Sequence, residues 1–300
     1  MNRFEAANRA SIWGMVGNIF LFIIKIIVGI ISRSQAMIAD AMNSASDILN
    51  SVMTYVGNRI ASKEADDDHN LGHGKAEYIY SMLISITMMI LGLTLLIDSF
   101  KALFNPSDYH FTIWLVIVCL ITIGTKLILF IYTHSIGKKY NNLLVDANSK
   151  DHRNDVVITT FNLIAAFASL YGFYLLDGIV GIGISLWIIY TGFKIFQESY
   201  DVLMDKSISK ETKDKVLKIV DEHSEVYKIQ HFNATPVGYR FQVSFSIFVD
   251  GNLSTFDSHE IANHLEKEIG EKVPEIYLTV IHVNPIDINK KDFVKRDTKK

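Results

Sequence analysis

Six long apolar stretches occupy the first two-thirds of this 300-residue sequence and constrain its fold more than any other feature. Each is close to the ~20 residues that an α-helix needs to cross the hydrocarbon core of a bilayer. The first is not a cleaved signal peptide, because it has no small-residue cleavage site and another span follows almost at once. The sequence therefore predicts six membrane helices, at Ser11–Ile31, Gln35–Gly57, Ala76–Phe100, Phe111–Thr133, Asp151–Leu176 and Gly178–Glu198.

The density of charged residues changes near Asp205. Of the 61 charged residues (29 Lys and Arg, 32 Asp and Glu), 31 lie in the first 205 positions and 30 in the last 95. This change predicts a six-span transmembrane domain over residues 1–205 and a soluble domain over residues 206–288. The final residues, 289–300, are charged and poor in apolar side chains, which is typical of a flexible tail.

The soluble region reads as a small α+β unit. Apolar spacing predicts helices at 209–223 and 254–269, and strands at 226–235, 239–250 and 277–283. In the second of these strands, Phe241, Val243, Phe245 and Ile247 alternate with polar or smaller residues, as in a half-buried strand. The order helix, strand, strand, helix, strand indicates a compact ferredoxin-like sheet.

Basic residues predict the orientation of the membrane domain. The N-terminal segment and the connections at 58–75 and 134–150 carry eight Lys and Arg residues, whereas the opposite side carries only Arg33 and Lys101. Because Lys and Arg concentrate in cytoplasmic connections, we expect both termini and the 206–288 domain in the cytoplasm. The prediction is a multi-pass protein of the plasma membrane.

Several classes of function are excluded by composition. A formal net charge of −3 gives no basic field for a nucleic acid. The single cysteine, Cys119, supports neither a disulfide framework nor a thiolate metal cluster. No Ser–His or Cys–His pairing is evident in the polar spans, and His259-Glu260 is followed by His264 one position too late for a zinc-protease motif. We therefore expect no enzymatic activity and no prosthetic group.

Acidic and amide side chains interrupt two of the predicted spans. A charge at bilayer depth costs at least ~2.5–3.5 kcal/mol, so each one requires an explanation. Asn43 and Asp47 are four residues apart, as are Asp151 and Asp155. This spacing places each pair on one helix face, about 6 Å apart along the axis. Two such faces opposed would direct four oxygen-bearing side chains to one point, which is suited to a divalent cation.

The alternative is that these polar groups only hydrogen-bond helices together. Two acidic i, i+4 pairs, with no evident charge partner among the spans beyond Arg153, favour the cation site over packing alone. The mid-span Lys25 and Lys126 are assigned no role, because a lysine side chain can extend toward the membrane interface.

Three motifs in these regions resemble the cation diffusion facilitator family. The signature of its second helix resembles Ala39-Asp40-Ala41-Met42-Asn43-Ser44-Ala45-Ser46-Asp47. The signature of its fifth helix resembles Asp151-His152-Arg153-Asn154-Asp155. The cytoplasmic segment before its third helix resembles Gly72-His73-Gly74-Lys75-Ala76-Glu77. The resemblance implies six spans and a metallochaperone-like cytoplasmic domain. It also implies a homodimer that exports a divalent metal by alternating access, usually against a flow of protons.

The resemblance assigns the primary transport site to the same four residues: Asn43, Asp47, Asp151 and Asp155. Asp40 lies one turn away on the same face, and we expect it on the permeation path rather than in the site. Zinc-transporting relatives usually have histidine at one of the four positions, and this sequence has none. Carboxylate and carbonyl oxygens suit manganese, and the set resembles the manganese-exporting branch. We therefore expect Mn²⁺ first, with Fe²⁺, Zn²⁺ and Co²⁺ as alternatives.

Two secondary sites also follow from the resemblance. Asp66, His69 and His73 match a loop site of some relatives, although an ordinary solvated acidic loop would look the same. In the soluble domain, His231, His259 and His282 fall where relatives carry regulatory ligands. Asn284 stands where an aspartate is often found, so a metal-free dimerisation sheet is an equal alternative there.

Two functions of other classes are compatible with acidic residues in membrane helices. A cation channel would more often present a symmetric ring than a deep chelating cluster. A membrane-bound metal sensor would keep the C-terminal fold but would need no polar pathway through the second and fifth spans. Only a carrier gives slow, saturable, gradient-driven transport.

Overall fold

The computed structural model describes residues 2–31, 35–104, 113–169 and 175–287. The chain divides into two compact units, Met1–Tyr200 and Asp201–Lys300, which we describe separately. The expected tail at 289–300 lies outside the described residues.

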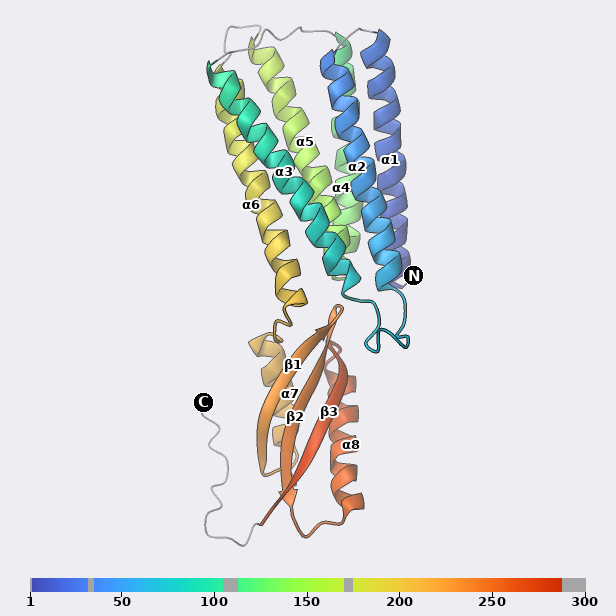
Figure 1. The fold of residues 1–300 in the computed structure, drawn as a ribbon, viewed down its shortest axis with the longest axis vertical. Helices are drawn as coiled ribbons and strands as arrows, with labels where there is room; N and C mark the ends of the chain where they lie inside the picture. Colours follow the sequence, from blue (N-terminus) through green and yellow to red (C-terminus); the bar gives the residue numbers. More distant parts are fainter. Residues whose placement is uncertain (1, 32–34, 105–112, 170–174, 288–300) are drawn as a thin grey trace. The chain divides into compact units, whose positions relative to one another are not determined.

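The first unit is a bundle of long helices that alternate in direction (Figure 1). Its core pairs are α1 with α2, α4 with α5, and α1 with α4. Glycine permits a close approach of α6 to α3, since a Cβ on Gly192 would lie 3.0 Å from the carbonyl oxygen of Ser85. The helices are α1 (Arg3–Ile31), α2 (Gln35–Ala61), α3 (Ala76–Phe104), α4 (Ile113–Lys139), α5 (Leu143–Ser169) and α6 (Leu175–Leu203).

Helix α5 begins eight residues earlier than the sequence pattern predicts, at Leu143 rather than Asp151. The charged residues at 143–150 favoured a cytoplasmic connection, but they form two further helical turns. Asn142 caps them, because its Oδ1 accepts a 2.9 Å hydrogen bond from the amide of Val145. The pair Asp151 and Asp155 therefore lies inside α5 rather than at its start.

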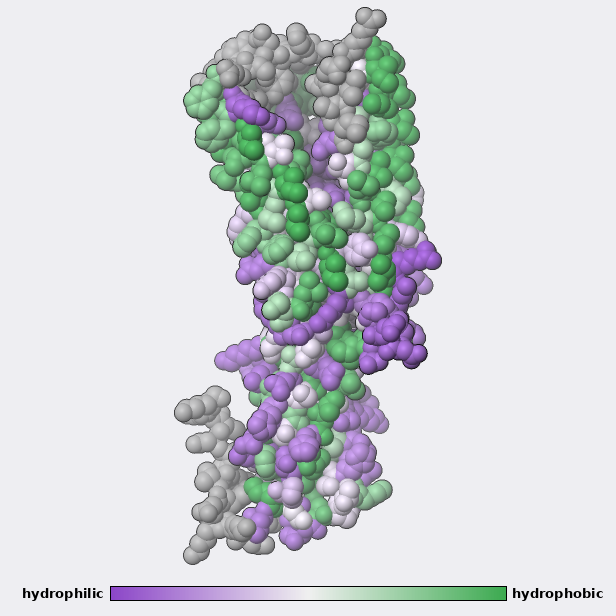
Figure 2. All heavy atoms as spheres, viewed as in Figure 1, coloured by the Kyte–Doolittle hydropathy of each residue, from purple (hydrophilic) through white to green (hydrophobic). Residues whose placement is uncertain are grey.

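The surface of this unit is apolar and its interior is partly polar. Figure 2 shows hydrophobic residues over most of the visible face of the bundle. Exposed side chains include Trp13, Ile128 and Tyr190, whereas Asn18 and Ser51 are buried. Such an inverted pattern is expected of helices surrounded by lipid.

Three helices in the described part of the chain, α1, α3 and α4, are long and apolar enough to span a bilayer by length and composition. Helices α2 and α5 have the length but carry several polar residues each, and these include the predicted metal ligands.

The second unit is an α+β domain with a three-stranded sheet in the order β1-β2-β3. Its elements are α7 (Lys210–Glu222), β1 (Lys228–Val237), β2 (Arg240–Asp250), α8 (Thr255–Lys272) and β3 (Ile276–Ile286). The central strand β2 pairs antiparallel with β1 and parallel with β3, and α8 makes the crossover between β2 and β3. Val243, Phe245 and Ile247 form its core with Leu265 and Ile269 of α8. The predicted element order and the alternating strand are confirmed.

Candidate metal centre

Three buried carboxylates converge in the six-helix unit. Asp47 comes from α2, and Asp151 and Asp155 come from successive turns of α5. One oxygen of each lies within 4.8 Å of the others, and the three residues are 5%, 2% and 5% exposed. These are three of the four residues that the two i, i+4 pairs predict at one point. Its oxygen donors and concentrated negative charge suit a hard divalent cation.

A lysine from α4 reaches into this cluster. Nζ of Lys126 donates hydrogen bonds to Oδ2 of Asp47 at 2.7 Å and to Oδ2 of Asp155 at 2.5 Å. Its side chain is 1% exposed. The sequence pattern gives Lys126 no role and indicates no charge partner for the acidic pairs beyond Arg153. Both expectations are wrong, because Lys126 pairs with two of the three carboxylates. In the predicted span, Phe111–Thr133, this residue lies seven positions from the end. In the structure α4 (Ile113–Lys139) is longer, and Lys126 is its middle residue.

One amide side chain bonds a carboxylate of the cluster, and another bonds the backbone of Asp47. Nδ2 of Asn50, on α2, donates to Oδ2 of Asp151 at 3.0 Å, while Oδ1 of Asn50 accepts from the hydroxyl of Thr87 on α3 at 3.2 Å. On the other side of α2, Nδ2 of Asn18 donates to the carbonyl oxygen of Asp47 at 3.0 Å. Three helices are thus joined to the cluster by side-chain bonds that sequence spacing did not indicate.

Two further predicted residues lie on α2 before Asp47. Asn43 is one turn away on the same face and is partly buried; its role as the fourth ligand remains a prediction. Asp40 forms an ion pair with Lys25 of α1, in which Nζ lies 2.9 Å from Oδ2. The same Nζ donates a hydrogen bond to the hydroxyl of Ser44 at 3.0 Å. Asp40 is therefore paired outside the carboxylate cluster.

The neighbouring residues of the α5 motif face elsewhere. His152 is fully buried, lies 3.4 Å from Nδ2 of Asn148, and faces Gly14 of α1. The guanidinium of Arg153 stacks over the ring of Trp187 at 4.3 Å. Neither side chain therefore belongs to the carboxylate cluster.

The loop residues Asp66, His69 and His73 also come together. Their ligand atoms lie within 4.8 Å of one another, and the rings of His69 and His73 are 4.3 Å apart. Nδ1 of His69 lies 3.1 Å from Oδ1 of Asp66. Desolvation raises the pKa of Asp66, but hydrogen bonds from His69 and the charges of His73 and His69 outweigh it and lower this pKa below its ordinary value. The trio is mostly exposed, and its use as a metal site remains a prediction.

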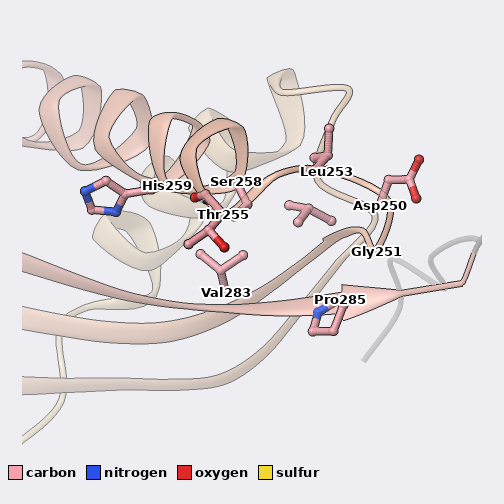
Figure 3. A pocket seen from close by; sticks show the side chains of 9 residues that line it. Asp250, Gly251, Leu253, Thr255, Ser258, His259, Val283 and Pro285 are labelled. Atoms are coloured by element: carbon pink, nitrogen blue, oxygen red, sulfur yellow. Dashed lines mark hydrogen bonds between the residues drawn. The ribbon is translucent and has the colours of Figure 1, made fainter.

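The structure does not bring His231, His259 and His282 of the same chain together. All three are exposed. His231 lies at the bulge of β1 and His282 on β3, on opposite sides of the central strand, which separates them by about 10 Å. His259 lies on α8, where it lines a pocket of about 280 Å³ with Asp250, Ser258 and others (Figure 3). A regulatory site built from these histidines remains a prediction.

Apolar helices around a deep carboxylate cluster, joined to a small α+β unit, fit the class of membrane proteins that carry metal cations. Residues 11–204 match the model of the cation efflux transmembrane domain, and residues 208–286 match that of the cation efflux protein cytoplasmic domain. The chain belongs to the cation efflux family, which is the cation diffusion facilitator family that its motifs resemble.

Similar proteins cover nearly the whole chain. The manganese efflux system protein MneP of Bacillus subtilis is 27% identical over 94% of this chain and 97% of its own length. MneS, a second manganese efflux system protein of that organism, is 28% identical over 96% of this chain and 99% of its own length. The magnetosome protein MamB of Magnetospira sp. is 24% identical over 92% of this chain and 94% of its own length. The resemblance inferred from three motifs is thus confirmed along the full domain order.

Proposed function

We propose that this chain exports Mn²⁺ from the cytoplasm by alternating access, in exchange for protons. The observation that carries the proposal is the convergence of Asp47, Asp151 and Asp155, buried and within 4.8 Å of one another. A charged group in a membrane interior is costly unless it serves a substrate or a partner. The ammonium of Lys126 is one partner for three carboxylates, so the cluster still favours a path for a divalent cation.

The choice of manganese rests on ligand chemistry. The cluster offers carboxylate oxygens, Asn43 adds an amide oxygen one turn away, and the nearest histidine, His152, faces α1. Oxygen ligands suit Mn²⁺, whereas imidazole suits zinc. Two of the similar proteins carry manganese efflux in their names, while MamB does not. Zn²⁺, Fe²⁺ and Co²⁺ efflux are the alternatives within the same family.

Proton exchange is proposed on grounds of charge. When a divalent cation leaves three carboxylates in a low-dielectric interior, the remaining negative charge is unfavourable. Protons entering from the other side would reduce it, so the ligands would also carry protons.

We further propose that two copies assemble as a dimer in the plasma membrane with both termini in the cytoplasm, in agreement with the cytoplasmic-domain match and the basic residues on that side.

The test is transport by the purified protein in sealed vesicles loaded with a metal indicator or with a pH dye. We expect slow, saturable Mn²⁺ flux, faster than Zn²⁺, Fe²⁺ or Co²⁺ flux, with a Mn²⁺-dependent pH change. Conductive, unsaturable flux would favour a channel, and binding without flux would favour a metal sensor. Flux without any pH change would exclude proton exchange. The exposed variant Asp98→Asn, at the end of α3, serves as the matched control.

A further inference from the structure

Lys126 is held at the depth of the carboxylate cluster. It is the middle residue of the 27-residue helix α4, so about 20 Å of helix separates it from either end. The side chain is 1% exposed, so its ammonium does not reach the surface of the bundle. The ammonium therefore needs partners inside the bundle.

Its partners are two of the proposed ligands. Nζ lies 2.7 Å from Oδ2 of Asp47 and 2.5 Å from Oδ2 of Asp155, and thus bridges α2 and α5 from α4. The side chain of Lys126 is 1% exposed, and those of its partners are 7% and 6% exposed. In this position the ammonium contacts the same carboxylate oxygens that a bound metal ion would contact.

A divalent cation and this ammonium compete for the same oxygens. The ligand atoms of Asp47, Asp151 and Asp155 lie within 4.8 Å of one another, so an ion held by all three would lie only a few ångströms from Nζ. At such distances in a protein interior, like charges repel strongly. Asp47 and Asp155 can satisfy either cation fully, but not both.

We infer that Lys126 is a tethered counter-cation that occupies the transport site between cycles and is displaced when the metal binds. The inference rests on the proposed function, because it assumes that Asp47 and Asp155 bind the transported ion. Two consequences follow. The lysine weakens metal binding, which permits release, and it neutralises part of the negative charge of the empty site during its return across the membrane.

The test compares Mn²⁺ binding by calorimetry in full-length purified variants. Lys126→Met keeps an unbranched side chain, one atom shorter, and removes its charge, so we expect the Kd for Mn²⁺ to fall roughly tenfold or more. Lys126→Arg keeps the charge and is expected to stay near the unaltered protein. Lys25→Met is the matched control, because it removes another buried ammonium whose partner, Asp40, lies outside the cluster. In vesicles at saturating Mn²⁺, Lys126→Met should turn over more slowly despite its tighter binding.

A Kd for Lys126→Met that is unchanged or higher would overturn the inference, since a purely structural lysine would give that result. If this variant fails to fold, a structure of the unaltered protein with Mn²⁺ bound provides the test. Nζ should then have left hydrogen-bond distance of Asp47 and Asp155, and an Nζ still in contact with both would overturn the inference. Failure of the proposed function would show differently, because the unaltered protein would then transport none of the four metals in vesicles, whatever the Kd of Lys126→Met.

Discussion

Nδ2 of Asn50 lies 3.0 Å from Oδ2 of Asp151, and this bond joins α2 to α5 directly beside the carboxylate cluster. Oδ1 of Asn50 is in turn held by the hydroxyl of Thr87 on α3. The orientation of one proposed ligand is therefore set by a chain of two hydrogen bonds through three helices. Groups that orient metal ligands in this way are part of the binding site in energetic terms.

We predict that Asn50→Ala weakens Mn²⁺ binding by about 10–100-fold, because Asp151 loses the donor that orients it. Thr87→Val removes only the outer bond of the chain and should have a smaller effect. Calorimetric Kd values for both variants provide the measurement. An Asn50→Ala variant that binds Mn²⁺ as well as the unaltered protein would show that Asp151 does not depend on this bond.

A second prediction concerns the ion pair between Arg3 and Glu77 at the end of the bundle near the N-terminus. Nη2 of Arg3 lies 2.7 Å from Oε2 of Glu77, which is 1% exposed, and Oε1 of Glu77 accepts from the amide of Leu143 at 2.7 Å. Breaking a buried pair costs about 3–5 kcal/mol. Glu77→Ala should therefore lower the thermal midpoint in detergent markedly, and Glu77→Gln less, because its amide oxygen still accepts from Leu143.

The control for this prediction is Lys101→Ala. It breaks an exposed ion pair with Asp98, in which both side chains are more than half exposed, and such pairs contribute about 0–1 kcal/mol. Equal midpoints for Glu77→Ala and Lys101→Ala would show that the buried pair adds nothing to stability.

The main features of the fold and half of the site could be predicted from the sequence. Apolar length and i, i+4 spacing are local properties, and they were sufficient to place Asn43 with Asp47, and Asp151 with Asp155, each on one helix face. That these two faces meet was implied by the family resemblance, and the structure brings Asp47 together with Asp151 and Asp155. The contributions of Lys126 and Asn50 were not predictable in this way. Each depends on which helices become neighbours and on how deep a side chain lies, and neither property has a sequence period.

The sequence also misplaced the start of α5, for a related reason. The segment at 143–150 is polar, and hydropathy alone marks it as a connection between spans. Its helical structure depends on the cap at Asn142 and on the burial of Leu144 and Val145 among other helices. Tertiary contacts thus extended a helix that its own composition did not favour.

The loop trio gives a third prediction, that Asp66, His69 and His73 bind a second ion. Asp155→Ala protein should then retain one metal-binding event, and adding His69→Ala should abolish it. Because the pKa of Asp66 is lowered, its carboxylate stays ionised in mild acid. Histidine binds metals only with a neutral ring, so binding should weaken as the pH falls, and the histidines should cause the loss. Binding titrations at two pH values provide the measurement, and an unchanged stoichiometry in the double variant would refute the loop site.

A fourth prediction concerns selectivity. Asp151→His and Asn43→His each introduce an imidazole, which suits zinc, so both should gain Zn²⁺ transport relative to Mn²⁺. Asn43→Asp keeps an oxygen-only set and should retain the preference for Mn²⁺. Parallel Zn²⁺ and Mn²⁺ uptake rates in vesicles distinguish the variants. If the uptake rates of Zn²⁺ and Mn²⁺ fall in equal proportion in both histidine variants, helix packing rather than ligand chemistry selects the ion.

The most direct test of the central claim is Mn²⁺ flux through Asp47→Ala, Asp151→Ala and Asp155→Ala in sealed vesicles. Each variant removes one carboxylate from the buried cluster. We predict that all three insert and fold normally but transport no Mn²⁺, while the exposed control Asp98→Asn transports at the unaltered rate. If any of the three alanine variants moves Mn²⁺ at that rate, the aspartate it lacks is not a ligand, and the cluster is not the transport site.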